Sequence, residues 1–266
     1  MTNDSTVDAD GDETVKMAPR SGGGDPALDL DGEPSADEAP PELRDRLVLA
    51  LDVDDVVEAV RLVHELKPWF GVAKVGLELF TSAGPDAVLS ILAEGMKVFV
   101  DLKLFDIPTT VGKAARVIGA LGASYLTLAG FAGVSMLRAG ADGLAAGASR
   151  AGLAPPTALA VTILTSDTGA PGHVLGNRVR AAVEAGCGGV VCAASDAAEV
   201  KHLAPHLVVV VPGIRTEGSP SHDHGRWATP GAAYAAGADL LVVGRTVTAA
   251  PDRAAAAARL IDSIVS

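Results

Sequence analysis

Three charged residues follow one apolar segment of this 266-residue chain, in the order Asp101, Lys103 and Asp106. Asp101 and Lys103 are two residues apart, so in an extended strand their side chains leave the same face, and Asp106 follows on a loop. Burying two carboxylates beside one ammonium is costly unless the charges pair. Nearby carboxylates keep an ammonium protonated, and such a group can stabilise negative charge and deliver a proton.

Two further charged residues, Asp52 and Lys74, stand at the ends of other apolar segments. Taken alone, Asp101 and Lys103 could be a salt bridge that closes the end of a sheet. An alternating array of Asp and Lys from three segments is harder to explain by packing. We therefore predict that these residues converge on one catalytic site, and no ligand cluster for a metal accompanies them.

A second polar group follows the last two apolar segments, which end in Pro212-Gly213-Ile214-Arg215 and in Gly244-Arg245. Glycine lets a backbone approach a ligand closely, and arginine offers a forked guanidinium to phosphate oxygens. Gly-Arg at one strand end could be ordinary turn chemistry. Because glycine and arginine follow both of the last two apolar segments, we predict a phosphate-binding site there.

Eight short apolar runs rich in β-branched residues alternate with eight Ala-rich helical windows between residues 45 and 265. Near-continuous apolar runs are typical of parallel strands buried on both faces. The expected strands are Leu47–Leu51, Val72–Val75, Val98–Asp101, Tyr125–Leu128, Ala158–Ile163, Gly189–Ala193, Val208–Val211 and Leu240–Val243. The expected helices are Val56–Lys67, Asp86–Ala93, Val111–Leu121, Ser135–Ala145, Arg178–Ala185, Ala197–Leu203, Pro230–Ala236 and Pro251–Ile264.

Eight β-then-α units indicate an α/β fold, the (β/α)₈ TIM barrel, as one domain over residues 45–266. In such barrels the functional residues lie at the carboxyl ends of the strands, where all the polar residues named above are expected. The alternative is a doubly wound open sheet. It would show a Gly-rich turn after its first strand, but residues 50–54 contain no glycine.

Residues 1–44 form a separate segment with twelve acidic and three basic residues, against a net charge of −12 for the whole chain. The segment has hardly any large apolar residues, so we expect a disordered tail. The nearly balanced remainder argues against a nucleic-acid partner. No apolar stretch is long enough for a membrane span, and the acidic start is unlike a signal peptide, so a cytoplasmic protein is expected.

The sequence DLKLFDIPTT, from Asp101 to Thr110, closely resembles the DxKxxDIPxT signature of the orotidine 5′-monophosphate decarboxylase family. Shorter motifs that contain Asp52, Lys74, Thr165, Arg215 and Arg245 follow in the family's order. The resemblance covers residues 45–265 and implies a cofactor-free decarboxylase that converts orotidine 5′-monophosphate into uridine 5′-monophosphate.

The resemblance also implies roles for the matching residues. Lys103 would protonate C6 of the pyrimidine as carbon dioxide leaves, and Asp101 would lie against the substrate carboxylate. Asp106 would enter the site of a second subunit, because the family forms homodimers with sites at the interface. The remaining matches are expected to bind substrate: Asp52 and Lys74 at the ribose, Thr165 at the base, and Arg215, Gly244 and Arg245 at the phosphate. Ile107 and Thr110 are also expected among the substrate-binding residues.

The chain departs from the family pattern at three places. Leu128-Ala129-Gly130 lacks a histidine that many relatives carry, and Thr246 stands where many bacterial members have proline. His224 takes the place of a loop glutamine that spans base and phosphate. None of these positions belongs to the charged array.

Two other functions fit parts of the pattern. A hexulose-phosphate synthase or ketogulonate-phosphate decarboxylase shares the Asp-x-Lys motif but uses Mg²⁺ and lacks the Ile-Pro-x-Thr run present at Ile107–Thr110. The second alternative is a barrel without catalytic activity, which binds a nucleotide or acts as a regulatory or scaffold protein. The intact set Asp52, Lys74, Asp101, Lys103 and Asp106 argues against it.

Overall fold

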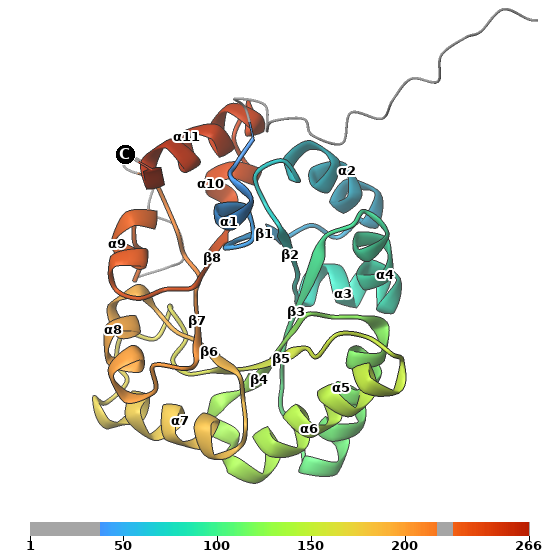
Figure 1. Ribbon diagram of the computed structural model, residues 1–266, viewed down its shortest axis with the longest axis vertical. Helices are drawn as coiled ribbons and strands as arrows, with labels where there is room; N and C mark the ends of the chain where they lie inside the picture. The colour runs from blue at the N-terminus through green and yellow to red at the C-terminus, as the bar shows by residue number, and fades with distance from the viewer. Residues whose placement is uncertain (1–37, 217–225, 266) are drawn as a thin grey trace, which may run out of the picture. The chain divides into compact units, whose positions relative to one another are not determined.

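Eight parallel strands close into a barrel in which every strand pairs with its neighbour in sequence and β1 also pairs with β8. This is a computed structural model, and it describes residues 38–216 and 226–265. The helices form a ring outside the strands, as Figure 1 shows in a view along the barrel. The predicted (β/α)₈ barrel is confirmed, and the alternative of an open sheet is wrong.

The strands are β1 (Leu47–Leu51), β2 (Val72–Val75), β3 (Lys97–Leu104), β4 (Tyr125–Ala129), β5 (Thr157–Val161), β6 (Gly189–Val191), β7 (Val208–Val211) and β8 (Leu240–Val243). The helices are α1 (Pro41–Arg44), α2 (Val56–Leu66), α3 (Leu77–Ala83), α4 (Pro85–Ala93), α5 (Pro108–Leu121), η1 (Gly130–Ala132, a 3₁₀ turn), α6 (Val134–Arg150), α7 (His173–Glu184), α8 (Ala194–Leu203), α9 (Pro230–Ala235), α10 (Arg245–Thr248) and α11 (Arg253–Val265). None of the described helices is both long and apolar enough to cross a membrane.

Several element bounds differ from the expectation, and three of the differences bear on the polar end of the barrel. Strand β3 continues to Leu104, so Asp101 and Lys103 both lie within it. A helix, α3, precedes α4, and the two are separated by Gly84, whose φ of 58° only glycine adopts readily. The single turn α10 follows β8 directly. Both extra helices come after strands, at the end of the barrel where the polar residues are expected.

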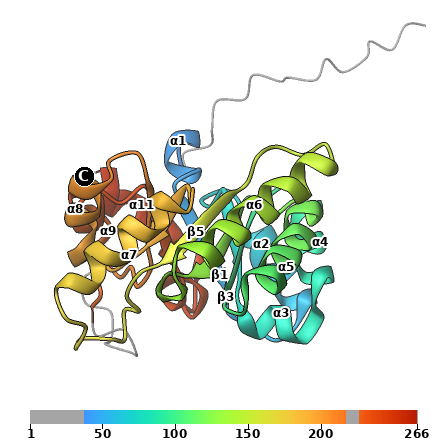
Figure 2. The same ribbon diagram turned by 90° about the horizontal axis from the view of Figure 1, so that it is seen from below.

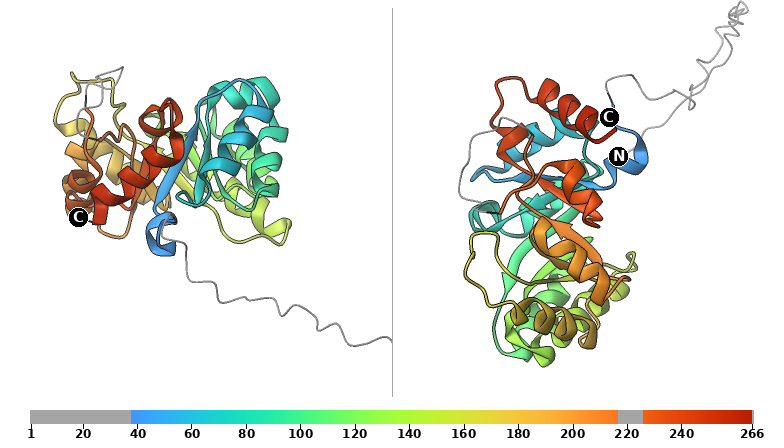
Figure 3. Two further views of the ribbon diagram at one scale, coloured as in Figure 1. Left: turned by 90° about the horizontal axis from the view of Figure 1, so that it is seen from above. Right: turned by 90° about the vertical axis from the view of Figure 1, so that its left-hand side faces the viewer.

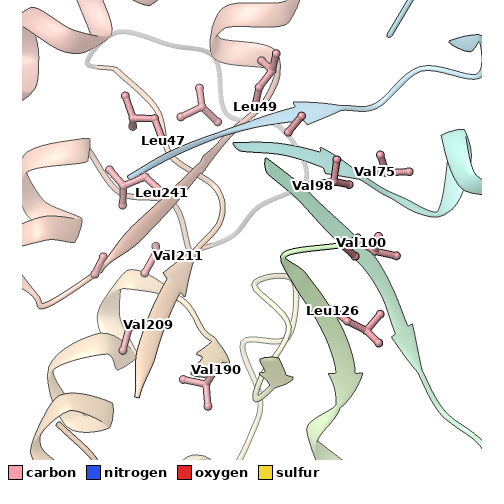
Figure 4. Packing of buried hydrophobic residues seen from close by; sticks show 14 of the residues in the cluster. Leu47, Leu49, Val75, Val98, Val100, Leu126, Val190, Val209, Val211 and Leu241 are labelled. Atoms are coloured by element: carbon pink, nitrogen blue, oxygen red, sulfur yellow. The ribbon is translucent and has the colours of Figure 1, made fainter. Parts of the chain in front are cut away.

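Alternation along the strands divides the apolar side chains into two layers. One layer faces outward, between strands and helices, and Figure 4 shows several of its members pointing away from the barrel axis, including Leu47, Leu49, Val98 and Val100. The other fills the barrel interior and is made by Val48, Ala50, Val72, Phe99, Leu159, Val210, Leu240 and Val242. Because every second residue faces inward, Asp52, Lys74, Asp101 and Gly244 continue the interior rows towards the carboxyl ends.

The predicted boundary between the tail and the barrel, after residue 44, lies too late in the sequence. Residues 38–44 are folded: the Ala39 side chain is buried, its backbone N–H donates to the Pro68 carbonyl at 3.1 Å, and Leu43 packs against the outer layer. Proline at the first helical position starts α1 despite the polar composition. Helix α1 lies at the amino ends of the strands, away from α3 (Figures 2 and 3). Residues 1–37 lie outside the described part.

Candidate active site

A cavity of about 670 Å³ opens at the carboxyl ends of the strands. The predicted site residues that line it are Asp52, Lys74, Asp101, Lys103, Thr165, Arg215, Gly244 and Arg245. The apolar floor comes from the interior layer, including Ala50, Phe99 and Val242. The structure therefore brings together residues from six strand ends that are up to 193 positions apart in sequence.

The charged residues form an alternating chain across one wall of this cavity. Lys103 Nζ lies 2.8 Å from Asp101 Oδ1, and Lys74 Nζ lies 3.0 Å from Asp52 Oδ1 and 3.9 Å from Asp101 Oδ2. The Lys74 and Asp101 side chains are only 12% and 17% exposed, whereas Asp52 is more open. Each described ammonium of the array thus faces at least one carboxylate, the pairing that burial of such charges requires.

Lys103 has an unusual backbone conformation. Its φ is 48°, the only positive value among the described residues other than glycine. The pairing of β3 with β4 also shifts register between Val100 and Leu104. Such backbone strain persists only where surrounding structure holds it, and it gathers at functional sites. No sequence pattern predicts it, because glycine is the usual signal for a positive φ.

Thr127 on β4 is a buried polar residue that sequence analysis missed. Its hydroxyl donates to Asp101 Oδ1 and accepts from the Lys103 backbone N–H, both at 2.9 Å. A threonine within Tyr125–Ala129 is ordinary for a strand, so its type carried no signal. Its position gave one: counting by twos from Tyr125, an interior residue, places Thr127 on the interior face.

Arg215 and Arg245 line the cavity from the segments that follow β7 and β8. The turn after β7 depends on Gly213, whose φ is 77°. The Thr246 hydroxyl donates to the Ile214 carbonyl at 3.1 Å, which links the two loops. Arg215 is buried, whereas Arg245 is exposed at the rim. This side of the cavity therefore offers two guanidinium groups, as predicted for a phosphate.

A second pair that sequence analysis missed supports the loop that carries Thr165. Arg226 Nη1 lies 3.0 and 2.8 Å from the two Asp196 carboxylate oxygens, and Arg226 Nη2 donates to the Leu164 carbonyl at 3.1 Å. The contact joins the loop after β5, the first turn of α8 and the segment between β7 and α9. Residues this distant in sequence show no pattern that would link them.

Cys192 also lines the cavity, next to this pair. Burial, strengthened by the nearby Asp196 carboxylate, raises the pKa of the Cys192 thiol to about 12. The thiol therefore stays neutral at physiological pH and is a poor nucleophile. Cys192 is buried and forms no disulfide.

Three predicted site residues do not line the cavity of their own chain: Asp106, Ile107 and Thr110. After Leu104 the chain turns outward, and all three side chains are exposed before α5 becomes buried at Val111. Asp106 Oδ1 accepts from the Ile107 backbone N–H at 2.6 Å, and Asp106 forms no ion pair with Lys103 in the described structure. The remaining predicted site residue, His224, lies outside the residues that the structure describes.

The two sequence neighbours of Asp106 are large apolar residues, and one of them contacts a further exposed phenylalanine. Phe105, Ile107 and Phe131 are 63%, 66% and 60% exposed, and the Phe105 and Phe131 ring centroids are 4.8 Å apart. We call Phe105, Ile107 and Phe131 together the aromatic patch, after its two phenylalanines. Contiguous apolar side chains exposed to solvent are typical of surfaces that bind another molecule.

Within residues 38–216 and 226–265, no three His, Cys, Asp or Glu side chains are grouped so as to hold a metal ion.

Comparisons with known proteins agree with this arrangement. The chain is 40% identical to an orotidine 5′-phosphate decarboxylase of Paramagnetospirillum magneticum over 223 residues, which are 80% of this chain and 95% of the relative. It is 42% identical to one of Parasynechococcus marenigrum over 224 residues, 80% of this chain and 91% of the relative.

Among solved structures, the orotidine 5′-phosphate decarboxylase of Lactobacillus acidophilus superposes with a TM-score of 0.69 at 31% identity, covering 84% of this chain and all of that one. Residues 45–260 match the Orotidine 5′-phosphate decarboxylase / HUMPS family. The family match and the relatives at 40% and 42% identity both cover most of the chain. This chain therefore belongs to the Orotidine 5′-phosphate decarboxylase / HUMPS family.

Proposed function

We propose that the chain is a carboxy-lyase that converts orotidine 5′-monophosphate into uridine 5′-monophosphate, a step of pyrimidine synthesis, using only its own side chains. The observation that carries the proposal is the alternating chain of Asp52, Lys74, Asp101 and Lys103 along one wall of the cavity. Membership of the family supports the reaction, and the array suggests how it proceeds.

The reaction breaks the bond between C6 of the pyrimidine and its carboxylate. Carbon dioxide leaves, the electron pair stays on C6, and the Lys103 ammonium donates the proton that completes the C6–H bond. Fixed charges are needed because the carbanion has no cofactor to delocalise it. Asp101, 2.8 Å from the Lys103 ammonium, pairs with that group and holds it at the cavity wall. Its charge also repels the substrate carboxylate, a repulsion that ends when carbon dioxide departs.

The rest of the cavity binds the nucleotide. Arg215 and Arg245 hold the phosphate through charge-assisted hydrogen bonds, and Gly244 lets the backbone approach it. Asp52 and Lys74 bind the ribose hydroxyls, and Thr165 contacts the base. His224 spans base and phosphate in the place of the family's glutamine. Binding energy from the phosphate helps to hold the substrate carboxylate against Asp101.

The functional unit we propose is a homodimer in which Asp106 completes the cavity of the second subunit, with Ile107 and Thr110 beside it. The support is that Asp106 is exposed and does not line the cavity that holds its own Lys103, and that two residues of the aromatic patch adjoin it in sequence. A second copy of the chain would bury that patch and place a carboxylate beside the partner's array.

The test is direct measurement of product. Purified protein is incubated with orotidine 5′-monophosphate, and uridine 5′-monophosphate and carbon dioxide are quantified against a Lys103→Ala control. Equimolar products with wild type and none with the control are expected. Failure of the wild type to form product would overturn the proposal. Activity on a hexulose- or ketogulonate-phosphate substrate instead would establish the Mg²⁺-dependent alternative.

A further inference from the structure

We propose that Thr127 is a positioning residue, one that holds Asp101 and the Lys103 backbone in their working geometry without touching substrate. The inference rests on the proposed function in one respect, namely that Asp101 and Lys103 carry the chemistry. Thr127 is fully buried and does not line the cavity, so it acts only through its neighbours.

The Thr127 hydroxyl is bonded on both sides. Its proton goes to Asp101 Oδ1, and its oxygen accepts the Lys103 N–H, both at 2.9 Å. The same Asp101 oxygen receives the Lys103 ammonium at 2.8 Å. One hydroxyl, one carboxylate oxygen and both nitrogens of Lys103 therefore form a closed loop of contacts. A hydroxyl can donate and accept at once, which no apolar side chain of that size can do.

The loop of contacts lies where β3 departs from regular pairing. The register of β3 on β4 shifts between Val100 and Leu104, and Lys103 has a φ of 48°. A left-handed lysine is strained and stays so only if its surroundings hold it. At this point a side chain of β4, Thr127, accepts the Lys103 N–H. The hydroxyl thus links the backbone strain at Lys103 to the orientation of Asp101.

Packing alone does not require the hydroxyl. Leu126 and Leu128, the neighbours of Thr127 on β4, belong to the outer apolar layer, whereas Thr127 faces the interior beside Asp101. Valine has the shape of threonine and would fill the same space. It would leave the Asp101 oxygen and the Lys103 N–H each short of one partner.

The experiment compares Thr127→Val with Thr127→Ser by steady-state kinetics on orotidine 5′-monophosphate. Thr127→Val should lower kcat about 10- to 150-fold, the effect of losing a hydrogen bond to a charged group, with KM changed less than about threefold. Thr127→Ser keeps the hydroxyl and should retain kcat within a few-fold. Thr162→Val is the matched control, because the buried Thr162 hydroxyl donates to the Val191 carbonyl away from the array. It should retain kcat.

Crystal structures of wild type and Thr127→Val give a readout that needs no activity. The variant should show Asp101 rotated or Lys103 returned to a negative φ. Wild-type kinetics in Thr127→Val, equal losses in the Ser and Val variants, or unchanged Asp101 and Lys103 geometry would each overturn the inference. If wild type itself makes no product, the proposed function fails, and the crystal structures still decide whether Thr127 holds the two residues.

Discussion

Complementation between two inactive variants tests whether Asp106 acts in the second subunit. Lys103→Ala removes the proton donor, a group whose loss typically costs about 10²- to 10⁴-fold in rate. Asp106→Ala removes one charge from the array and should cost about 10²- to 10³-fold if that charge is aimed at the reacting centre. Each variant alone should therefore form a nearly inactive homodimer.

The size of the recovery follows from the geometry. Asp106 is exposed outside its own cavity, whereas Lys103 lines it. In a mixed dimer with Asp106 shared between subunits, one site carries both lesions and the other carries neither. Random exchange of equal amounts makes half of the dimers mixed, so a two-fold dimer should recover about a quarter of wild-type activity. If Asp106 acts within its own chain, no site in the mixture is intact.

The assay follows substrate loss after exchange at equal concentrations, with the fraction of mixed dimers measured by native mass spectrometry. The matched control mixes Lys103→Ala with Asp101→Ala. These residues lie 2.8 Å apart in one cavity, so that mixture should stay inactive. Exchange without recovery for the Asp106 pair would refute the shared site, and recovery in the Asp101 mixture would refute the assignment of both residues to one cavity.

Three further predictions concern the tail, the phosphate and the packing of α5 on α6. Removal of residues 1–37 should leave kcat and KM unchanged, whereas removal of 1–44 also deletes the packed segment 38–44 and should lower Tm by about 2–4 °C per kcal/mol lost in a thermal melt. Arg245→Ala should raise the KM for the nucleotide about 10- to 150-fold but hardly affect orotidine, which has no phosphate. Gly147→Ala should cost about 1–3 kcal/mol in denaturant unfolding, because its Cβ would lie 2.0 Å from the Arg116 carbonyl oxygen.

Each of these predictions has its own contrary result. A large fall in kcat after removal of 1–37 would mean that the tail takes part in the site. Equal losses for the nucleotide and for orotidine would make Arg245 structural. Gly231→Ala is the control for Gly147, since no atom lies within 4 Å of its added Cβ, and equal destabilisation of the two would contradict the packing argument.

The barrel and most of the site could be predicted from sequence because both depend on local periodicity. Apolar runs separated by helical windows predict buried parallel strands, and residues two apart share a face, which is enough to place Asp101 and Lys103 together. The carboxyl ends of all eight strands meet at one end of a barrel, so Asp52, Lys74 and Arg245 follow from the fold.

Features that depend on contacts between distant segments could not be predicted in this way. Thr127 looks like any strand threonine until β4 is placed beside β3. Arg226 reaches Asp196 only after α8 and the segments that follow β5 and β7 come together. The positive φ of Lys103 lies within the register shift of β3 on β4 and has no residue-type signal. Residues 38–44 fold because a few side chains pack on the outer layer, which average composition conceals.

The central claim is that the side chains of the cavity, with no metal, decarboxylate the nucleotide. The most direct test is the rate of loss of orotidine 5′-monophosphate absorbance after exhaustive chelation, with residual metal measured by elemental analysis and Mg²⁺ added back in a parallel sample. The account predicts the full rate in the chelated enzyme and no gain from Mg²⁺. Loss of activity on chelation, restored by Mg²⁺, would contradict it.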